Sequence, residues 1–285
     1  MDRSSIKALL ESFKSSNQNN YDGMVTFSIQ RLEYLIKAFD YYFTSAWVKP
    51  DNETLKIFYE DGIRYFKHFQ KLPRFTSLSD KEMLPWIEIA ENAWSFSSGT
   101  KQPITWKGKP LLKNCYDLAL LQMMIYDLKP DRIIELGSWN GASADYMHSL
   151  CQAFSLSTQI YSFDIINTST VIDPSSSVHY LYGDNTNQST YEPYLSSIKG
   201  RTLLIEDSHV NFTATLDMFL PVLRDEDYII VEDIRTRSGT KFQQFATWYD
   251  NHSDQLLCDN YYVDYFGAET STFGLGILKY VRTNR

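Results

Sequence analysis

A carboxylate and two glycines follow an apolar run in the segment RIIELGSWNGAS, residues 132–143. The apolar run predicts a β-strand, and the small residues after the second glycine predict the start of a helix. Glycines at such a turn let the backbone approach a ligand closely. The candidate ligand-binding residues of this turn are Glu135, Gly137, Ser138, Gly141 and Ser143.

The spacing of this turn indicates the kind of ligand. A dinucleotide-binding fold has G-x-G-x-x-G, with a pyrophosphate at the helix N-terminus. Here Glu135 occupies the first glycine position, and the pattern becomes E-x-G-x-x-x-G. A carboxylate repels a pyrophosphate but suits S-adenosylmethionine, which carries a sulfonium and an ammonium group. The turn therefore favours S-adenosylmethionine as the cofactor.

Two later acids fit the same cofactor. Asp164 ends the apolar segment QIYSFD, where a carboxylate can accept hydrogen bonds from two ribose hydroxyls. Asp184, in the segment YGDN, is expected near the adenine. For any single acid of this kind, a helix cap or a solvated turn is the alternative interpretation.

Carboxylates recur at the end of every predicted strand of this half of the chain. Since ligands bind beyond the carboxyl ends of parallel strands, these acids are expected to line one cleft. The predicted strands, one to five in chain order, are residues 131–136, 159–164, 178–184, 201–207 and 227–233. The acids at their ends are Glu135, Asp164, Asp184, the pair Glu206 and Asp207, and the pair Glu232 and Asp233.

From about residue 116, predicted helices and strands alternate, which is typical of βαβ units. We predict an α/β fold with a Rossmann-like, doubly wound, mainly parallel sheet, closed by an antiparallel hairpin over residues 261–281. Before residue 100, apolar and aromatic residues recur at three- and four-residue spacing, which predicts amphipathic helices. The expected domains are a helical lid or oligomerisation region, 1–104, and a cofactor-binding methyltransferase domain, 105–285. The helical region is expected to roof the substrate pocket, and its aromatic surface is a candidate homo-oligomer contact.

The composition of the chain limits the classes of partner that we expect. The chain has 27 Lys and Arg against 35 Asp and Glu and no long basic run, so we expect no nucleic-acid partner. No segment approaches the roughly 18 apolar residues of a membrane span, so we expect no membrane partner. Cys115, Cys151 and Cys258 form no CxxC or Cys/His pattern, which suits reduced thiols and a cytoplasmic location. A small molecule is the expected substrate.

The stretch ITWKGKPLLKNCYDLALLQMMIYDLKPDRIIELGSWNGASADYM resembles the cephalosporin hydroxylase-like and rhamnosyl O-methyltransferase families. These families share a W-x-G-x-P-x-x-K lead, which includes Trp106 and Lys113 here, then a D-x-x-x-x-Q helix and a KPD turn before the glycine motif. The resemblance runs from about Thr105 to Ile234. It implies a class I S-adenosylmethionine-dependent methyltransferase that acts on a hydroxyl of a natural product or sugar, often with Mg²⁺.

The resemblance also implies a metal site, held by an acid after strand four and an acidic pair after strand five. The matching residues are Asp207, Glu232 and Asp233. The families commonly have D-x-x-H after strand four, whereas EDSH offers either Glu206 or Asp207 before His209, so the strand-four ligand stays open.

The chemistry of methyl transfer accounts for these residue types. The reaction needs a nucleophilic oxygen in line with the sulfonium methyl. A cation held by carboxylates would orient the substrate and lower the pKa of its hydroxyl. His209, with Asp207, is the candidate general base, and a structural histidine is the alternative. Successive side chains of a strand point to opposite faces, so Glu232 and Asp233 can both bind a metal only if the chain bends there.

Two other classes of function stay open at this stage. A methyltransferase acting on nitrogen, carbon or a carboxylate would need no metal. A non-catalytic protein could keep only the S-adenosylmethionine pocket. The sequence identifies neither the substrate nor the methylated atom.

Overall fold

The structure is a computed structural model, and it describes residues 8, 11, 73–80, 97–99, 103–166, 178–196, 198–234, 239–266 and 271–282. The chain divides into two compact units, residues 1–73 with 100–102 and residues 74–99 with 103–285. All strands reported below belong to the second unit. The predicted helical lid over residues 1–104, and its position over the strand ends, lie almost entirely outside the described residues.

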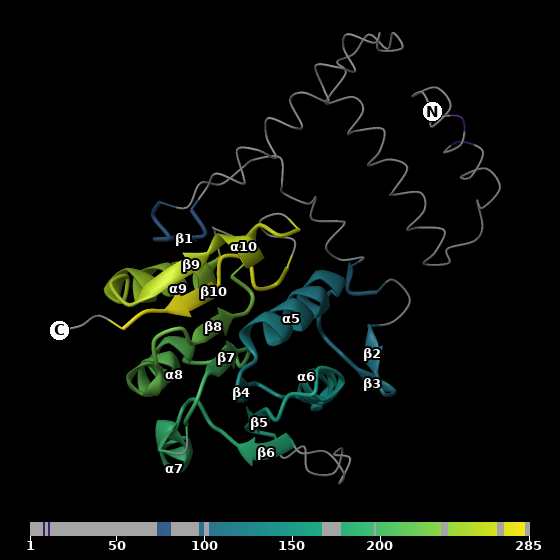
Figure 1. Ribbon diagram of the computed structural model, residues 1–285, viewed down its shortest axis with the longest axis horizontal. Coiled ribbons are helices and arrows are strands. Elements are labelled where there is room, and N and C mark those ends of the chain that lie inside the picture. Colours follow the sequence, from purple (N-terminus) through teal and green to yellow (C-terminus); the bar gives the residue numbers. More distant parts are fainter. Residues whose placement is uncertain are drawn as a thin grey trace. The chain divides into compact units, whose positions relative to one another are not determined.

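An eight-stranded sheet forms the centre of the second unit (Figure 1), in the order β1-β9-β10-β8-β7-β4-β5-β6. The five predicted strands are all present and pair in parallel, which confirms the mainly parallel α/β fold. They are β4 (Arg132–Leu136), β5 (Gln159–Asp164), β6 (Val178–Tyr182), β7 (Thr202–Glu206) and β8 (Tyr228–Val231).

The strand order reverses at β4. The chain proceeds from β4 to β5 and β6 on one side, then returns to place β7 and β8 on the other. In an open α/β sheet the crevice at such a reversal is the usual ligand site. The loops after β4 and β7 therefore hold the position where a ligand is expected.

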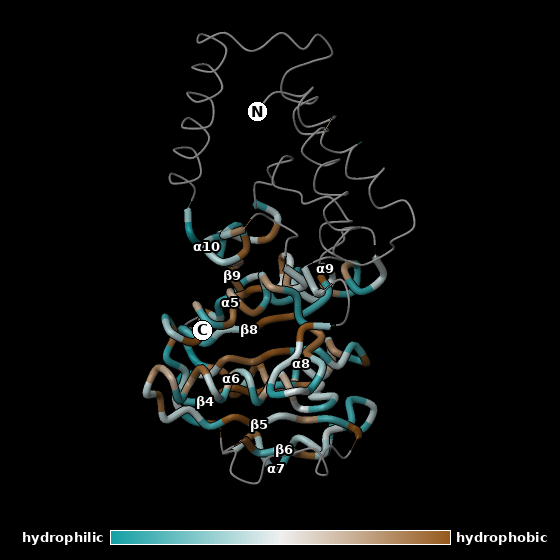
Figure 2. The backbone as a smooth tube through the Cα atoms, turned by 90° about the vertical axis from the view of Figure 1, so that its right-hand side faces the viewer, coloured by the Kyte–Doolittle hydropathy of each residue, from teal (hydrophilic) through white to brown (hydrophobic). Residues whose placement is uncertain are grey.

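Helices cover both faces of the sheet. Figure 1 shows α5 (Cys115–Leu128) and α6 (Ala142–Ala153) on one side, and α8 (Phe212–Phe219) and α9 (Thr240–Asn251) on the other. The central strands are the most hydrophobic stretches of the backbone trace in Figure 2, because β7 and β8 are buried on both faces and β4 nearly so. Short helical turns complete the connections: η2 (Gln188–Thr190), α7 (Glu192–Leu195), η3 (Leu220–Val222) and α10 (Asn260–Val263).

Helix α5 has clear sequence reasons to begin and end where it does. The Asn114 side chain accepts hydrogen bonds from the backbone of Tyr116 and Asp117, and the Asp117 side chain accepts one from the Asn114 backbone, which completes a capping box. At the other end Lys129 adopts the left-handed conformation, directly before a proline that cannot continue the helix.

The C-terminal part corrects the predicted hairpin. Its second strand, β10 (Ile277–Tyr280), lies within the predicted range and pairs antiparallel with both β8 and β9. The first strand, β9 (Leu256–Asp259), ends before residue 261, where the prediction placed it. The physical reason is a helix cap: the Asp259 side chain accepts a hydrogen bond from the Tyr261 backbone and starts α10.

Three two-residue strands were not predicted. β1 (Phe75–Thr76) pairs with β9 at the sheet edge, and β2 (Thr105–Trp106) pairs with β3 (Lys109–Pro110) in a separate small hairpin. The hairpin contacts α6 through an ion pair between Lys109 Nζ and Asp145 Oδ2 at 2.8 Å. It leads directly to the start of α5.

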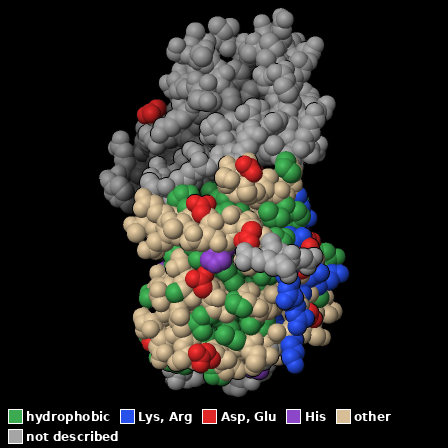
Figure 3. Space-filling view, turned by 90° about the vertical axis from the view of Figure 1, so that its left-hand side faces the viewer, with side chains coloured by type: hydrophobic (Ala, Val, Ile, Leu, Met, Phe, Trp, Pro, Cys, Tyr) green, Lys and Arg blue, Asp and Glu red, His purple; other side chains and the backbone are tan. Residues whose placement is uncertain are grey.

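Two surface properties complete the description. Within the part of the chain that the structure describes, no helix has the length and apolar character to cross a membrane. The face drawn in Figure 3 gathers Lys and Arg side chains along one edge and carries acidic side chains singly elsewhere.

Candidate active site

The loops after β4 and β7 touch each other. Gly137 has φ 103°, and a Cβ atom there would lie 2.6 Å from the backbone oxygen of Asp207. The Asp207 N–H donates to the Leu136 carbonyl at 2.8 Å. Only glycine fits this position, and its absence of a side chain brings the predicted cofactor turn next to a predicted metal ligand.

Glu135 lies beneath this turn rather than in it. Its side chain is buried, and its two oxygens accept hydrogen bonds from the hydroxyls of Ser143 and Ser162. Burial raises the pKa of Glu135 above its ordinary range, against the opposing effect of the nearby Lys113 charge. Glu135 and Ser143 thus tie the first turn of α6 to β4 and β5, and their contact with a cofactor stays a prediction.

The other residues of the turn have distinct surroundings. Ser138 is buried, and its hydroxyl has no hydrogen-bond partner among the described residues. Gly141 has φ 76°, and a Cβ atom there would lie 2.7 Å from a ring carbon of Tyr180, whose hydroxyl donates to the Gly141 carbonyl. The turn is therefore packed tightly at Gly141 and offers an unused polar group at Ser138.

Asp164 is held at the end of β5 by two backbone groups. Its Oδ2 accepts from the Trp139 N–H at 2.7 Å and its Oδ1 from the Ile166 N–H at 2.8 Å. The residue is half-buried, and each oxygen keeps a second lone pair. This arrangement leaves Asp164 able to accept two further hydrogen bonds, as the ribose prediction requires.

Asp184 bonds within its own turn. One carboxylate oxygen accepts from both the backbone and the hydroxyl of Thr186, and these bonds lower the pKa of Asp184. The neighbouring Asn185 is a residue that sequence analysis missed. Its side-chain nitrogen lies 2.5 Å from the Ser208 hydroxyl and donates to the Val210 carbonyl at 2.8 Å, so it joins the loops after β6 and β7.

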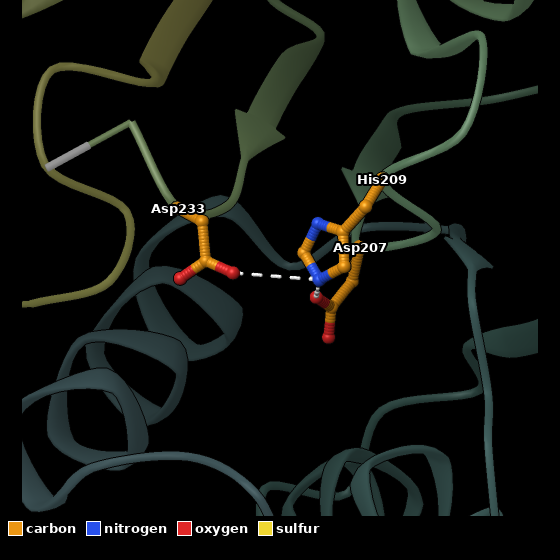
Figure 4. Close-up of side chains that lie close together, drawn as sticks. All are labelled: Asp207, His209 and Asp233. Carbon is orange, nitrogen blue, oxygen red and sulfur yellow. Dashed lines mark ion pairs between the residues drawn. The ribbon is translucent and has the colours of Figure 1, made fainter. Parts of the chain in front are cut away.

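Asp207, His209 and Asp233 form one cluster (Figure 4). His209 Nε2 lies 3.2 Å from Asp207 Oδ1 and 3.4 Å from Asp233 Oδ2. A metal-binding atom of each residue lies within 4.8 Å of the other two. Asp207 and His209 come from the loop after β7 and Asp233 from the turn after β8. The cluster brings together both predicted catalytic residues and two of the three predicted metal ligands.

Backbone conformation sets the direction of these side chains. His209 has φ 62° and Asp233 has φ 58°, a left-handed region that non-glycine residues seldom adopt. The chain therefore turns sharply after β8, and Asp233 and Glu232 point to different surroundings. Such strained positions concentrate at functional sites.

Glu206 is separated from the cluster by its own hydrogen bonds. It is fully buried, and one oxygen accepts from the backbone N–H groups of Ser208 and His209 at 3.0 and 3.1 Å. The other oxygen accepts from Lys241 Nζ at 3.1 Å. Lys241 also lies 2.8 Å from His209 Nδ1. Of the two acids that the sequence left open after strand four, the one in the cluster is Asp207.

Glu232, the third predicted metal ligand, bonds to a lysine. Lys113 Nζ lies 2.7 Å from Glu232 Oε1 and 2.5 Å from Asp207 Oδ2. Burial alone would lower the pKa of Lys113, but the carboxylates of Asp207 and Glu232 outweigh it and raise this pKa well above its ordinary value. The sequence drew attention to Lys113 through the W-x-G-x-P-x-x-K lead, without indicating this partner.

Comparison with known proteins identifies the family. Residues 99–248, more than half of the chain, match the family described as Rhamnosyl O-methyltransferase/CmcI. A rhamnosyl O-methyltransferase of Mycobacterium leprae (strain TN) is 25% identical over 170 residues, which cover 56% of this chain and 73% of that protein.

Solved structures agree on the fold. An apo structure of CmcI has a TM-score of 0.58 at 20% identity and covers 86% of this chain and all of that one. A CmcI structure with Mg and SAM has a TM-score of 0.56 at 21% identity and covers 78% of this chain and all of that one. The chain belongs to the rhamnosyl O-methyltransferase/CmcI family and is an S-adenosylmethionine-dependent O-methyltransferase.

Proposed function

We propose that this enzyme transfers a methyl group from S-adenosylmethionine to a hydroxyl of a small natural product or sugar, with the help of a divalent cation such as Mg²⁺. The observation that carries the proposal is the cluster of Asp207, His209 and Asp233 at the ends of two adjacent strands. The related CmcI structure with Mg and SAM, and the name of the rhamnosyl O-methyltransferase relative, support it.

The cofactor side of the proposal uses the turn after β4. Gly137 and Gly141 give the turn its positive φ angles, and the unused Ser138 hydroxyl supplies a hydrogen-bonding group. Asp164 accepts from the ribose, and Asp184 lies on the adenine side. Glu135 and Ser143 hold the turn in place through their mutual hydrogen bond. S-adenosylmethionine, when bound, supplies a methyl group on a positively charged sulfur.

The donor atoms of the cluster fit a divalent cation. The carboxylates of Asp207 and Asp233 provide the oxygen ligands that Mg²⁺ prefers, and Glu232, which lies against Lys113, is the third predicted ligand. The side chains of His209 and Asp233 are about half exposed, so open positions remain for water and substrate. A cation held there would supply positive charge beside the substrate oxygen, which lowers the pKa of its hydroxyl.

The proton acceptor is the pair formed by Asp207 and His209. The substrate hydroxyl gives its proton to this pair as its oxygen forms the bond to the methyl carbon, and the sulfur keeps the electron pair of the bond that breaks. Lys241 lies against His209 Nδ1 and orients the ring, so that Nε2 faces Asp207. The chain's own contribution is thus orientation and proton removal.

The proposals about the N-terminal region and about the location of the protein rest on the sequence alone. We propose that residues 1–104 form a helical lid or oligomerisation region beside a cofactor-binding domain over 105–285, and that the protein acts in the cytoplasm, as its unpatterned cysteines suggest.

The test has two stages on the full-length protein. Calorimetry with S-adenosylhomocysteine measures the cofactor site. Labelled S-adenosylmethionine is then offered with rhamnosides and hydroxylated natural products, each beside a control whose hydroxyls are already methylated. We expect label only in the free alcohols. Transfer to an amine or carboxylate instead, or turnover unchanged after chelation, would refute the corresponding part of the proposal.

A further inference from the structure

A cavity lies between helices α8 and α9, on the face of the sheet opposite α5 and α6 (Figure 1). Its volume is about 420 Å³, which falls within the range of roughly 300–1,000 Å³ that small-molecule sites occupy. All of its described lining residues belong to these two helices or directly follow α9. It therefore shares no residue with the cofactor turn or with the acid cluster.

One wall of the cavity is a network of Asp217, Trp248 and His252. Trp248 Nε1 donates to Asp217 Oδ1 at 2.7 Å, and His252 Nε2 lies 3.4 Å from the same oxygen. His252 Nδ1 lies 2.8 Å from the backbone oxygen of Trp248, and the two rings lie 5.1 Å apart. Because Trp248 is buried, this network fixes the Asp217 carboxylate through one oxygen only.

Several polar groups of the lining have no partner within the described part of the chain. The second oxygen of Asp217 is one of them, and its side chain is 51% exposed. The side-chain amides of Gln243, Gln244 and Asn251 are the others, and all three residues are exposed. An amide offers both donors and an acceptor, whereas an ionised carboxylate only accepts. The cavity can therefore exchange hydrogen bonds in both directions with a ligand.

The charge of the lining limits the class of ligand. Among the described residues that line the cavity, Asp217 is the one acid and none is a lysine or an arginine, so an anion would be repelled. One carboxylate is too few for Mg²⁺ or Ca²⁺, which take several oxygen ligands. An apolar ligand would bury the amides without partners. A neutral molecule with several hydroxyls fits, since each hydroxyl both donates and accepts.

We propose that the cavity between α8 and α9 binds a neutral sugar. The free oxygen of Asp217 accepts a hydrogen bond from a sugar hydroxyl. The amides of Gln243, Gln244 and Asn251 pair with neighbouring hydroxyls. This sugar site is separate from the place of methyl transfer, and the inference does not depend on the proposed function.

The test titrates the full-length protein with methyl glucoside, methyl mannoside and methyl galactoside, followed by saturation-transfer NMR. The methyl uronide of each sugar is the matched control ligand, because it differs by one carboxylate. We expect saturable binding of at least one neutral sugar. Its uronide should bind roughly fivefold more weakly or worse, because Asp217 repels the added charge.

Two pairs of variants locate the site. Asp217→Asn should weaken binding of the neutral sugar roughly tenfold, since a hydrogen bond to a charged acceptor is lost. Asp250→Asn is its control, an exposed acid of α9 outside the lining. Gln244→Ala should weaken binding roughly fivefold, whereas Gln152→Ala, an exposed glutamine of α6, should leave it unchanged.

Three outcomes would overturn the inference. The first is that none of the three neutral sugars binds saturably to the wild-type protein. The second is that the uronide binds as tightly as the neutral sugar. The third is that Asp217→Asn and Gln244→Ala behave like their controls, which would place the sugar elsewhere. If Asp217→Asn does not fold, Gln244→Ala decides the question, because it leaves the bond between Asp217 and Trp248 intact.

Discussion

Gly137 and Asp207 lie in backbone contact, and this contact joins the two halves of the candidate active site. A Cβ atom on Gly137 would lie 2.6 Å from the Asp207 backbone oxygen and 2.8 Å from the Ser208 nitrogen. One residue belongs to the turn predicted to bind the cofactor and the other to the acid cluster. The strand order reverses between β4 and β7, and this reversal is what places the two loops side by side.

Replacing Gly137 with alanine should therefore destabilise the protein. The left-handed backbone costs a side chain roughly 1–2 kcal/mol, and overpacking against fixed backbone adds roughly 1–3 kcal/mol. The control is Gly108→Ala, which has φ 81° but nothing within 4 Å of the new Cβ, so it should show the backbone cost alone. Urea denaturation measures both. Equal losses of stability in the two variants would contradict the close contact.

Removing the Asp164 carboxylate should weaken binding of S-adenosylhomocysteine. Hydrogen bonds from ribose hydroxyls to the charged carboxylate would be lost, and each is worth about 1.5–3 kcal/mol. Asp164 also accepts from the Trp139 and Ile166 backbones, so a thermal melt must first show that Asp164→Ala is folded. Calorimetry then gives the affinity. Asp184→Ala is the companion variant, because its carboxylate serves its own turn, and it should lose less affinity.

We predict that the enzyme loses its methyl-transfer activity when divalent cations are chelated. Dialysis against EDTA should abolish methyl transfer, and added Mg²⁺ or Mn²⁺ should restore it, because the substrate hydroxyl then lacks its positive neighbour. Binding of S-adenosylhomocysteine should survive the same treatment, which shows that the protein is intact. Anomalous scattering from Mn²⁺-soaked crystals locates the ion. A peak far from Asp207 and Asp233 would contradict the site.

The sheet was predictable because buried parallel strands appear in sequence as uninterrupted apolar runs, here each ending in an acid. The hairpin of β2 and β3 was not, since two-residue strands show no periodicity. Glu206 and Asp207 looked alike because both follow the same run. Their different surroundings depend on Lys241 and Lys113, which lie 35 and 94 residues away in the chain. Contacts between residues so far apart in sequence leave no local pattern. Only the structure therefore distinguishes the buried Glu206 from Asp207 in the cluster.

Asp259 provides a prediction about stability at the opposite edge of the sheet. This fully buried carboxylate accepts hydrogen bonds from Arg74, the Tyr228 hydroxyl and the Tyr261 backbone. Asp259→Asn should lower the free energy of unfolding by roughly 1–3 kcal/mol, because the bonds to a charged partner are lost. Glu226→Gln is the control, since the Glu226 side chain is 53% exposed and an ion pair of an exposed carboxylate is worth roughly 0–1 kcal/mol. Similar urea midpoints for both variants would show that the buried network contributes little.

Lys241 tests whether His209 acts in proton removal. Lys241 Nζ lies 2.8 Å from His209 Nδ1, and this contact holds the ring with Nε2 towards Asp207. General acid–base groups contribute roughly 10²–10⁴-fold to rate, so His209→Asn should lower kcat by about that factor. Lys241→Met should lower kcat less, roughly tenfold, because the ring keeps its place but loses its orientation. Lys241→Arg keeps a long cationic side chain beside the ring and should recover part of the loss. Affinity for S-adenosylhomocysteine should stay unchanged in all three variants, since none belongs to the turn after β4. A His209→Asn enzyme with the wild-type kcat would exclude His209 from proton transfer, leaving Asp207 as the acceptor.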